Sequence, residues 1–188
     1  MNKNLLHYLI TDPKYYSNDK DLFRKNLEKV LKTKKVDMAC FRDKESENFE
    51  ILAQIFVQTC KEFNIKKILI NGNYSLVHSL GATGVHLTST QFDEIKEAKE
   101  LNLYTIISCH TFNDIEKALN SYCNAVTYSP IFDTPNKGEP KGITTLKEAI
   151  SLYEDIDIFA LGGIVKQEHV EQISKTKACG FASIRYFI

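Results

Sequence analysis

Short runs of consecutive apolar residues alternate along this chain with longer segments whose apolar residues recur every three or four positions. Residues 6–10 form the first apolar run, and the segment 21–31 then places Phe23, Leu27 and Val30 on one helical stripe. The run is typical of a buried strand, and the stripe is typical of an amphipathic helix. We therefore expect a strand followed by a helix.

The same strand and helix pair recurs through the whole chain. The expected strands cover residues 6–10, 38–41, 67–70, 84–87, 104–108, 125–128, 156–161 and 181–184. The expected helices cover residues 21–31, 49–63, 75–80, 92–101, 115–122, 146–153 and 170–176. This alternation predicts a parallel sheet. We expect a single domain over residues 1–188, an α/β TIM (β/α)8 barrel that is compact and lacks the final helix, because the sequence after the eighth strand is too short for one.

A doubly wound open sheet is the competing architecture for such a pattern. In a dinucleotide-binding sheet of that kind, the first strand-to-helix turn contains glycines that let the backbone approach a pyrophosphate. Here the first turn reads Thr11-Asp-Pro-Lys-Tyr15 and contains no glycine. The barrel is therefore favoured, and in a barrel the ligands bind in the loops after the carboxyl ends of the strands.

The charge balance narrows the class of partner. The 188 residues include 24 Lys plus Arg and 24 Asp plus Glu, so no net charge attracts nucleic acid or an acidic membrane. No apolar stretch is long enough to span a membrane, and the beginning of the sequence lacks a signal-peptide core, which favours a cytoplasmic protein. The five cysteines are widely spaced and include no CxxC pair, which argues against a disulfide framework and against a zinc site.

Basic side chains follow two of the expected strands. After the second strand, alternation points Cys40, Arg42 and Lys44 to the same side of the chain, toward the barrel mouth. Lys137 lies in a Pro- and Thr-rich loop after the sixth strand. Because Arg offers a bidentate fork and Lys a mobile charge, these residues predict a phosphate clamp. A solvated loop with incidental cations is the alternative.

Two further loops carry candidate chemistry. Gly162 and Gly163 follow the seventh strand, where barrels recurrently bind phosphate, and a helix that begins near Gln167 could direct N–H groups toward the anion. An ordinary tight turn is the alternative. His110 follows the fifth strand and could move a proton near neutral pH, while His86, inside the fourth strand, is a weaker candidate.

An ordered set of motifs runs along nearly the whole chain. The motifs are Tyr8-Leu-Ile-Thr-Asp12, Arg42-Asp-Lys44, Ile70-Asn71, Gly84-Val-His-Leu87, Ser108-Cys-His-Thr111, Ser129-Pro-Ile-Phe-Asp-Thr134, Lys137 and Gly162-Gly-Ile164. In order and spacing this set resembles the thiamine phosphate synthase/TenI family. The resemblance implies a TIM barrel that handles the phosphorylated thiazole half of thiamine, and in the synthases also a pyrimidine pyrophosphate.

The resemblance also implies roles for individual residues. Four positions match family residues that hold the pyrophosphate: Arg42, Lys44, Asn71 and Lys137. Ser108 and Thr134 match polar positions at the mouth. The pair Gly162-Gly163 matches the cradle of the thiazole phosphate.

Several positions depart from the synthase pattern. The synthases carry Asp ligands for magnesium where this chain has Gly72 and Gln91. Magnesium prefers carboxylate oxygens, so we expect no cofactor, and Mg²⁺ only if the protein is a synthase. The family's Gln is Cys40 here, and the last strand ends in Ile184-Arg185, at the substrate side of the mouth where synthases usually have a small polar residue.

TenI-type members of the family lack these carboxylates too, and they isomerise a thiazole phosphate tautomer by a proton shift that needs no metal. Their catalytic His aligns with Pro130, so His110, Cys40 or Lys137 must supply the acid/base group here, with His110 ranked first. We expect a thiazole tautomerase of thiamine biosynthesis. The alternatives are a divergent thiamine phosphate synthase, which joins pyrimidine pyrophosphate to thiazole phosphate, and a non-catalytic or regulatory barrel that binds a phosphate ligand.

A barrel without its eighth helix leaves the outer faces of the eighth and first strands uncovered, near Leu6, Phe181 and Tyr186. Exposed apolar patches of this kind usually find a partner. We therefore expect a homodimer, or an N-terminal or neighbouring helix shifted over the gap. In either arrangement Phe187 and Ile188 should be buried.

Overall fold

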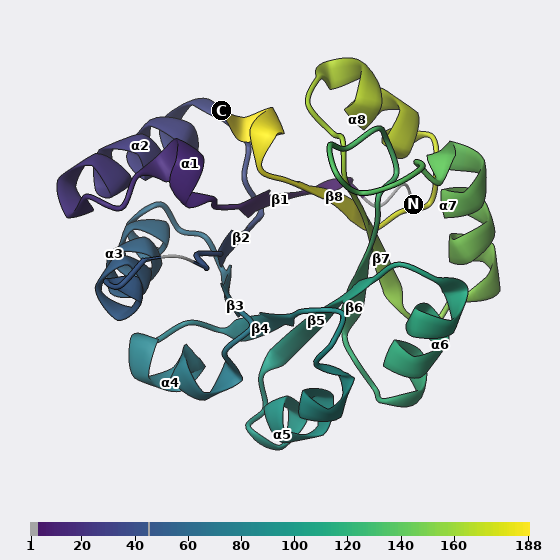
Figure 1. Cartoon of the computed structure of the whole chain (residues 1–188), viewed down its shortest axis with the longest axis horizontal. Helices are drawn as coiled ribbons and strands as arrows, with labels where there is room; N and C mark the ends of the chain where they lie inside the picture. Colours follow the sequence, from purple (N-terminus) through teal and green to yellow (C-terminus); the bar gives the residue numbers. More distant parts are fainter. Residues whose placement is uncertain (1–3, 45) are drawn as a thin grey trace.

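The computed structural model describes residues 4–44 and 46–188. Eight parallel strands pair in chain order, and the eighth pairs with the first, so that Leu6 lies opposite Gly180 and Leu9 opposite Ser183. Figure 1 looks along the barrel, with the strands in a ring and the helices outside it. The predicted TIM barrel is confirmed, and the closed ring excludes an open doubly wound sheet.

Each expected strand is present, and its ends differ from the predicted ones by at most one residue. The strands are β1 (Leu6–Ile10), β2 (Met38–Phe41), β3 (Lys67–Asn71), β4 (Gly84–Leu87), β5 (Tyr104–Cys109), β6 (Ala125–Tyr128), β7 (Asp157–Leu161) and β8 (Gly180–Ser183). Parallel strands are buried on both faces, so each reads in the sequence as a nearly continuous apolar run.

Each expected helix is also present, although several begin earlier than predicted. The helices are α1 (Pro13–Tyr16), α2 (Lys20–Thr33), α3 (Phe49–Glu62), α4 (Val77–Leu80), α5 (Ile95–Glu100), α6 (Phe112–Asn120), α7 (Gly142–Leu152) and α8 (Gln167–Ser174), with 3₁₀ turns η1 (Tyr74–Leu76), η2 (Phe92–Glu94) and η3 (Arg185–Phe187). The early start of α6 has a local cause, since Thr111 and Asp114 form a capping box. Within residues 4–44 and 46–188, no helix has the length and apolar character needed to cross a membrane.

The short helix α1 was not predicted. Its N-cap is Asp12, whose side chain accepts a hydrogen bond from the backbone N–H of Lys14, and Pro13 occupies the first turn. A proline at this position needs no hydrogen-bond donor. The turn that the sequence presents as a loop therefore folds into one helical turn beside the barrel mouth.

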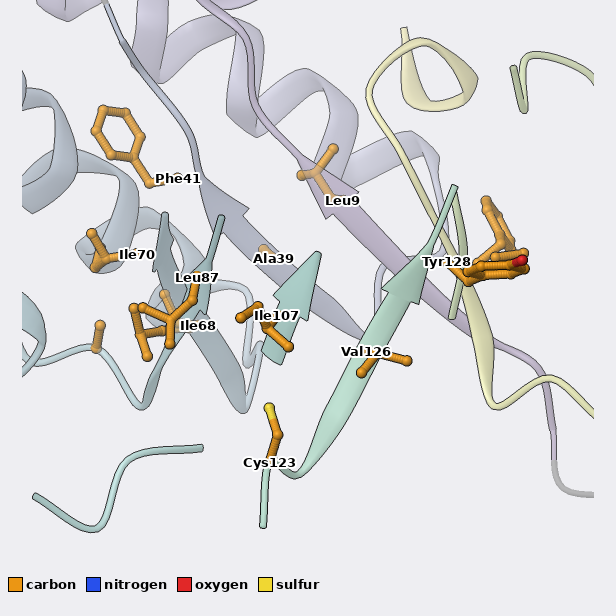
Figure 2. Packing of buried hydrophobic residues seen from close by; sticks show 14 of the residues in the cluster. Leu9, Ala39, Phe41, Ile68, Ile70, Leu87, Ile107, Cys123, Val126 and Tyr128 are labelled. Carbon is orange, nitrogen blue, oxygen red and sulfur yellow. The ribbon is translucent and has the colours of Figure 1, made fainter. Parts of the chain in front are cut away.

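Two apolar cores lie on either side of the sheet. The barrel interior is filled by Tyr8, Ile10, Met38, Cys40, Leu69, Ile106, Ala125, Phe159 and Ala182. Alternate strand residues point outward and pack beneath the helices, among them Leu9, Phe41, Ile70 and Val126 in Figure 2. Because side chains fill the interior in layers, the ligand-sized space is left to the barrel mouth.

The gap that the missing helix would leave is covered by the chain itself. The turn η3 follows β8 and lies between α2 and α8 in Figure 1, where Tyr186 donates a hydrogen bond of 2.9 Å to Gln167. Phe187 is 1% exposed, which confirms its predicted burial, and Phe181 is 0% exposed. Ile188 is 56% exposed, so its predicted burial is wrong. The short turn η3 takes this place in the described chain, and the homodimer and the shifted helix both stay predictions.

Candidate active site

A cavity of about 690 Å³ opens where the strands end, lined by residues at the carboxyl ends of the strands and in the loops that follow them. A space of this size suits a small-molecule ligand. The predicted site residues that line it are Arg42, Lys44, Asn71, Ser108, His110, Thr134, Lys137, Gly162, Gly163, Ile184 and Arg185. The structure thus brings together residues that are far apart in the sequence, while their individual roles stay predictions.

Cys40 does not line this cavity. Its side chain is fully buried in the barrel interior beside Tyr8 and Met38, one layer below Arg42. Burial raises the pKa of the Cys40 thiol to about 12, which keeps it protonated and unreactive. The prediction that Cys40 lies at the mouth is wrong, because strand alternation gives the direction of a side chain and not its depth.

The cationic side of the mouth is organised around Arg42. Its guanidinium donates a hydrogen bond of 2.8 Å to Oδ2 of Asp12, and its backbone N–H donates to the hydroxyl of Thr11 at 2.8 Å. The two ion-pair side chains are 30% and 25% exposed, so the pair adds about 1 kcal/mol or less to stability. Its main effect is to fix the direction of the guanidinium.

A second cavity of about 480 Å³ adjoins the first, and four of its lining residues also line the larger one. The shared residues are Asp12, Lys14, Arg42 and Lys44. Three of these side chains are cationic. One of the three, Arg42, is paired with Asp12, and the two lysines add further positive charge, so this side of the mouth could hold a phosphate or diphosphate group.

The glycine pair after β7 packs tightly against the loop after β6. Gly162 and Gly163 have backbone φ angles of 94° and 68°, which residues with a side chain rarely adopt. A Cβ atom on Gly163 would lie 2.4 Å from the carbonyl oxygen of Asp133, and the backbone N–H of Phe132 donates to the Gly162 carbonyl at 3.0 Å. Glycine is therefore required here for loop packing, while the predicted phosphate-binding role stays a prediction.

The N-terminus of the helix after this loop, which was predicted to direct N–H groups toward an anion, does not line the cavity. Although α8 begins at Gln167, as expected, the cavity residues of this segment end at Ile164. The remaining wall comes from the end of β8 and the start of η3, where Ser183, Ile184 and Arg185 line the cavity. On this side the cavity is thus lined by two loops and not by a helix terminus.

The imidazole of His110 is held at the rim by the neighbouring loop. Its Nδ1 lies 3.2 Å from the carbonyl oxygen of Ser129. The hydroxyl of Ser129 lies 3.3 Å from the same Nδ1. Because the carbonyl oxygen can only accept a hydrogen bond, the arrangement that satisfies both contacts has Nδ1 as the donor and the hydroxyl oxygen as a second acceptor. Nε2 then keeps its lone pair, and His110 can accept a proton from a ligand in the cavity.

His86, which the sequence presents as a weaker candidate than His110, also borders the cavity. The ring is 3% exposed and lines the cavity from inside β4. Nδ1 lies 2.9 Å from the hydroxyl of Tyr8, and Nε2 lies 3.1 Å from the hydroxyl of Ser108. Burial, with a smaller effect from the charge of Arg42, lowers the pKa of His86 to about 4, so the ring is neutral at pH 7. Strand alternation puts His86 on the opposite face of β4 from Val85 and Leu87, but both faces of the strand are buried, so alternation alone does not say which one is the inner face.

The two positions that would carry magnesium ligands in a synthase lie together at the mouth. Gln91 donates a hydrogen bond of 2.8 Å to the carbonyl of Gly72 and one of 2.9 Å to Glu94, while its Oε1 accepts from Thr88. Among the described residues, no group of three or more His, Cys, Asp or Glu side chains could hold a metal ion. At these two positions the chain offers a backbone carbonyl and an amide in place of the carboxylates that magnesium prefers.

Comparison with known proteins identifies relatives over almost the whole chain. The family described as thiamine monophosphate synthase matches residues 7–187. A thiamine-phosphate synthase of Syntrophomonas wolfei subsp. wolfei is 31% identical, over 98% of this chain and 88% of that protein. The one of Anoxybacillus flavithermus is 30% identical over 71% of this chain, and the match spans 62% of the relative, less than two thirds of its length.

Solved structures share the fold. A thiamine phosphate pyrophosphorylase from Pyrococcus furiosus superposes with a TM-score of 0.81 at 19% identity, over 97% of this chain and 87% of that one. The 2-keto-3-deoxy-6-phosphogluconate aldolase of Zymomonas mobilis reaches a TM-score of 0.73 at 12% identity, over 96% and 81% of the two chains. Likeness at such low identity shows the barrel alone, whereas the sequence match over residues 7–187 is specific. The chain belongs to the thiamine monophosphate synthase family.

Proposed function

We propose that this protein acts in thiamine biosynthesis as a thiazole tautomerase, which converts a non-aromatic thiazole phosphate into its aromatic isomer. One observation carries the proposal: Gly72 and Gln91 replace the magnesium carboxylates, while both glycines of the phosphate loop are kept. A tautomerisation moves only a proton and needs no metal. The departure of pyrophosphate, in contrast, normally relies on a metal to neutralise charge.

The phosphate of the substrate would bind at the glycine side of the mouth. Backbone N–H groups of Gly162 and Gly163 can approach an anion closely because no side chain intervenes. Thr134, Lys137 and Arg185 line the same cavity and add a hydroxyl and two cations. This arrangement supports binding of a monophosphate ester with its ring directed toward His110.

The proton transfer is assigned to His110. Nε2 takes a proton from one position of the non-aromatic ring system, and the resulting imidazolium returns it at another position, so no atom is gained or lost. The carbonyl of Ser129, 3.2 Å from Nδ1, stabilises the cationic intermediate by accepting the Nδ1 hydrogen bond. Aromaticity of the product drives the reaction forward.

Replacement of His110 tests this assignment. In an assay that follows formation of the aromatic thiazole phosphate, His110→Ala should lower kcat by roughly 100-fold or more if the imidazole carries the proton. The matched control is His78→Ala, because His78 is exposed and hydrogen-bonded to Leu101, away from the cavity. A rate unchanged by His110→Ala removes His110 from the role.

A divergent synthase is the second candidate, and the cationic side of the mouth favours it. Lys14, Arg42 and Lys44 line both cavities and could hold the pyrophosphate of a pyrimidine substrate. The thiazole nitrogen would then attack the pyrimidine methyl carbon, and pyrophosphate would leave. Any Mg²⁺ would have to be bound chiefly by the oxygens of that pyrophosphate. If neither reaction is detected, a phosphate-binding barrel without catalysis becomes the better assignment.

A further inference from the structure

The imidazole of His86 joins the barrel interior to the wall of the cavity. Nδ1 contacts the hydroxyl of Tyr8 on β1 at 2.9 Å, and Nε2 contacts the hydroxyl of Ser108 on β5 at 3.1 Å. Thr127 on β6 makes a longer contact of 3.4 Å with the same Nε2. Tyr8 and Thr127 are fully buried, while Ser108 lines the cavity. His86 is therefore the link between a buried hydroxyl and one that a ligand can reach.

The partners of Tyr8 determine which nitrogen of His86 carries the proton. Burial raises the pKa of the Tyr8 hydroxyl well above its ordinary value, so the group stays protonated and has one hydrogen to donate. Two groups could accept it: Nδ1 of His86 and the sulfur of Cys40, which also interacts with this hydroxyl. An imidazole nitrogen is a much stronger acceptor than a thiol sulfur. Nδ1 therefore accepts from Tyr8, and the proton of the neutral ring is on Nε2.

This tautomer sets the direction of the hydrogen bond to Ser108. With its proton on Nε2, His86 donates to the Ser108 oxygen, and the hydroxyl hydrogen of Ser108 must point elsewhere. We propose that Tyr8 and His86 are positioning residues that make Ser108 a hydrogen-bond donor into the cavity. The ligand recognised there carries an acceptor, either an anionic oxygen or a ring nitrogen. With the opposite tautomer, Ser108 would donate to His86 and present only its lone pairs.

NMR of the ligand-free protein labelled with ¹⁵N-histidine tests the tautomer without any assumption about the reaction. His86→Gln identifies the His86 signals by their disappearance. We expect a neutral ring at pH 7, with a protonated Nε2 and an unprotonated Nδ1. A ring protonated mainly on Nδ1, or on both nitrogens, overturns the proposal.

Tyr8→Phe tests the origin of the tautomer. Without the Tyr8 donor, the single Nε2-protonated form should give way to a mixture of tautomers. Tyr16→Phe is the matched control, because the Tyr16 hydroxyl is buried and has no hydrogen-bond partner among the described residues. A spectrum of His86 that Tyr8→Phe leaves unchanged rules out Tyr8 as the positioning group. If Tyr8→Phe does not fold, the wild-type spectrum still decides the tautomer.

Turnover supplies a second readout, which rests on the proposed function. Tyr8→Phe should lower kcat for thiazole phosphate isomerisation roughly tenfold and leave KM within about twofold, since a hydrogen bond near the reacting ring is lost while the phosphate contacts remain. Ser108→Ala should have a similar effect, and the double variant should lose little more. If the losses of kcat in Tyr8→Phe and Ser108→Ala add up in the double variant, the two residues do not act through one hydrogen-bond chain that includes His86. If the wild-type protein does not isomerise the substrate, the proposed function is contradicted. The NMR experiment then remains as the test of the positioning role of Tyr8 and His86.

Discussion

The side-chain amide of Gln91 donates a hydrogen bond of 2.8 Å to the backbone carbonyl of Gly72, which ties the loop after β4 to the end of β3. The same amide nitrogen lies 2.9 Å from a carboxylate oxygen of Glu94, and the amide oxygen accepts from Thr88. A carboxylate at this position could accept hydrogen bonds but could not donate them to the Gly72 carbonyl and to Glu94. The loop that would hold a metal in a synthase is thus built around an uncharged side chain.

Ligand binding should therefore not depend on magnesium. In titration calorimetry, the Kd of thiazole phosphate should stay within about twofold when EDTA is added, because the proposed contacts are N–H groups, hydroxyls and cations. Loss of binding on chelation would show that Asp12, Asp43 or Asp93 takes part in a metal site. The assignment as a synthase would then be better supported than the assignment as a tautomerase.

The glycine loop gives a prediction about stability. Gly163→Ala should lower the free energy of unfolding by about 2 kcal/mol or more and weaken phosphate binding, because backbone strain is joined by a clash with Asp133. Gly138→Ala isolates the strain: φ is 72° there too, but no atom lies within 4 Å of the added Cβ. Its cost should be about 1 kcal/mol. Equal costs in urea denaturation would show that the clash is relieved by loop movement.

Arg42 gives a prediction about anion recognition. Arg42→Lys keeps the positive charge but loses the fork that Asp12 orients, so the affinity for inorganic pyrophosphate should fall about tenfold. Arg24→Lys is the matched control, because Arg24 pairs with Glu28 and Glu62 outside the cavity. Binding can be followed by calorimetry at one fixed salt concentration. If Arg42→Lys binds pyrophosphate as tightly as the wild type, the position contributes only its positive charge and not the geometry of the guanidinium.

The buried imidazole of His86 makes stability depend on pH. Its pKa falls from 6.5 to about 4 on folding, so the unfolded chain binds the proton more tightly. The contribution is fully present above pH 6.5 and is lost as the pH falls through about 4. A shift of this size corresponds to about 3 kcal/mol. His7, whose pKa is also lowered by burial, acts in the same direction.

Urea denaturation at about pH 7 and about pH 4 measures this effect. The wild-type protein should lose more stability between these conditions than His86→Gln, which lacks the titrating ring, while Tyr16→Phe should lose as much as the wild type. An equal loss in wild type and His86→Gln would mean that other groups cause the acid sensitivity.

The sequence predicts the barrel well because burial on both faces of each strand leaves a local signal. It predicts the direction of Arg42 and Cys40 but not the depth of Cys40, since depth depends on how the strands are staggered in the closed ring. The hydrogen-bond partners of His86 could not be predicted from the sequence, because Tyr8 and Ser108 are 78 and 22 residues away in the chain. The covering turn η3 is too short to carry a periodic pattern.

The central claim is that this protein isomerises a thiazole phosphate and does not condense it with a pyrimidine. Both reactions can be measured on the same wild-type preparation, the first without divalent metal and the second with pyrimidine pyrophosphate, thiazole phosphate and Mg²⁺. We predict aromatic thiazole phosphate at an ordinary enzymatic rate, on the order of 0.1 to 10 per second, and condensation at least about 100-fold slower. Thiamine phosphate formed at an ordinary rate, with no isomerisation detected, would contradict this account and establish the synthase.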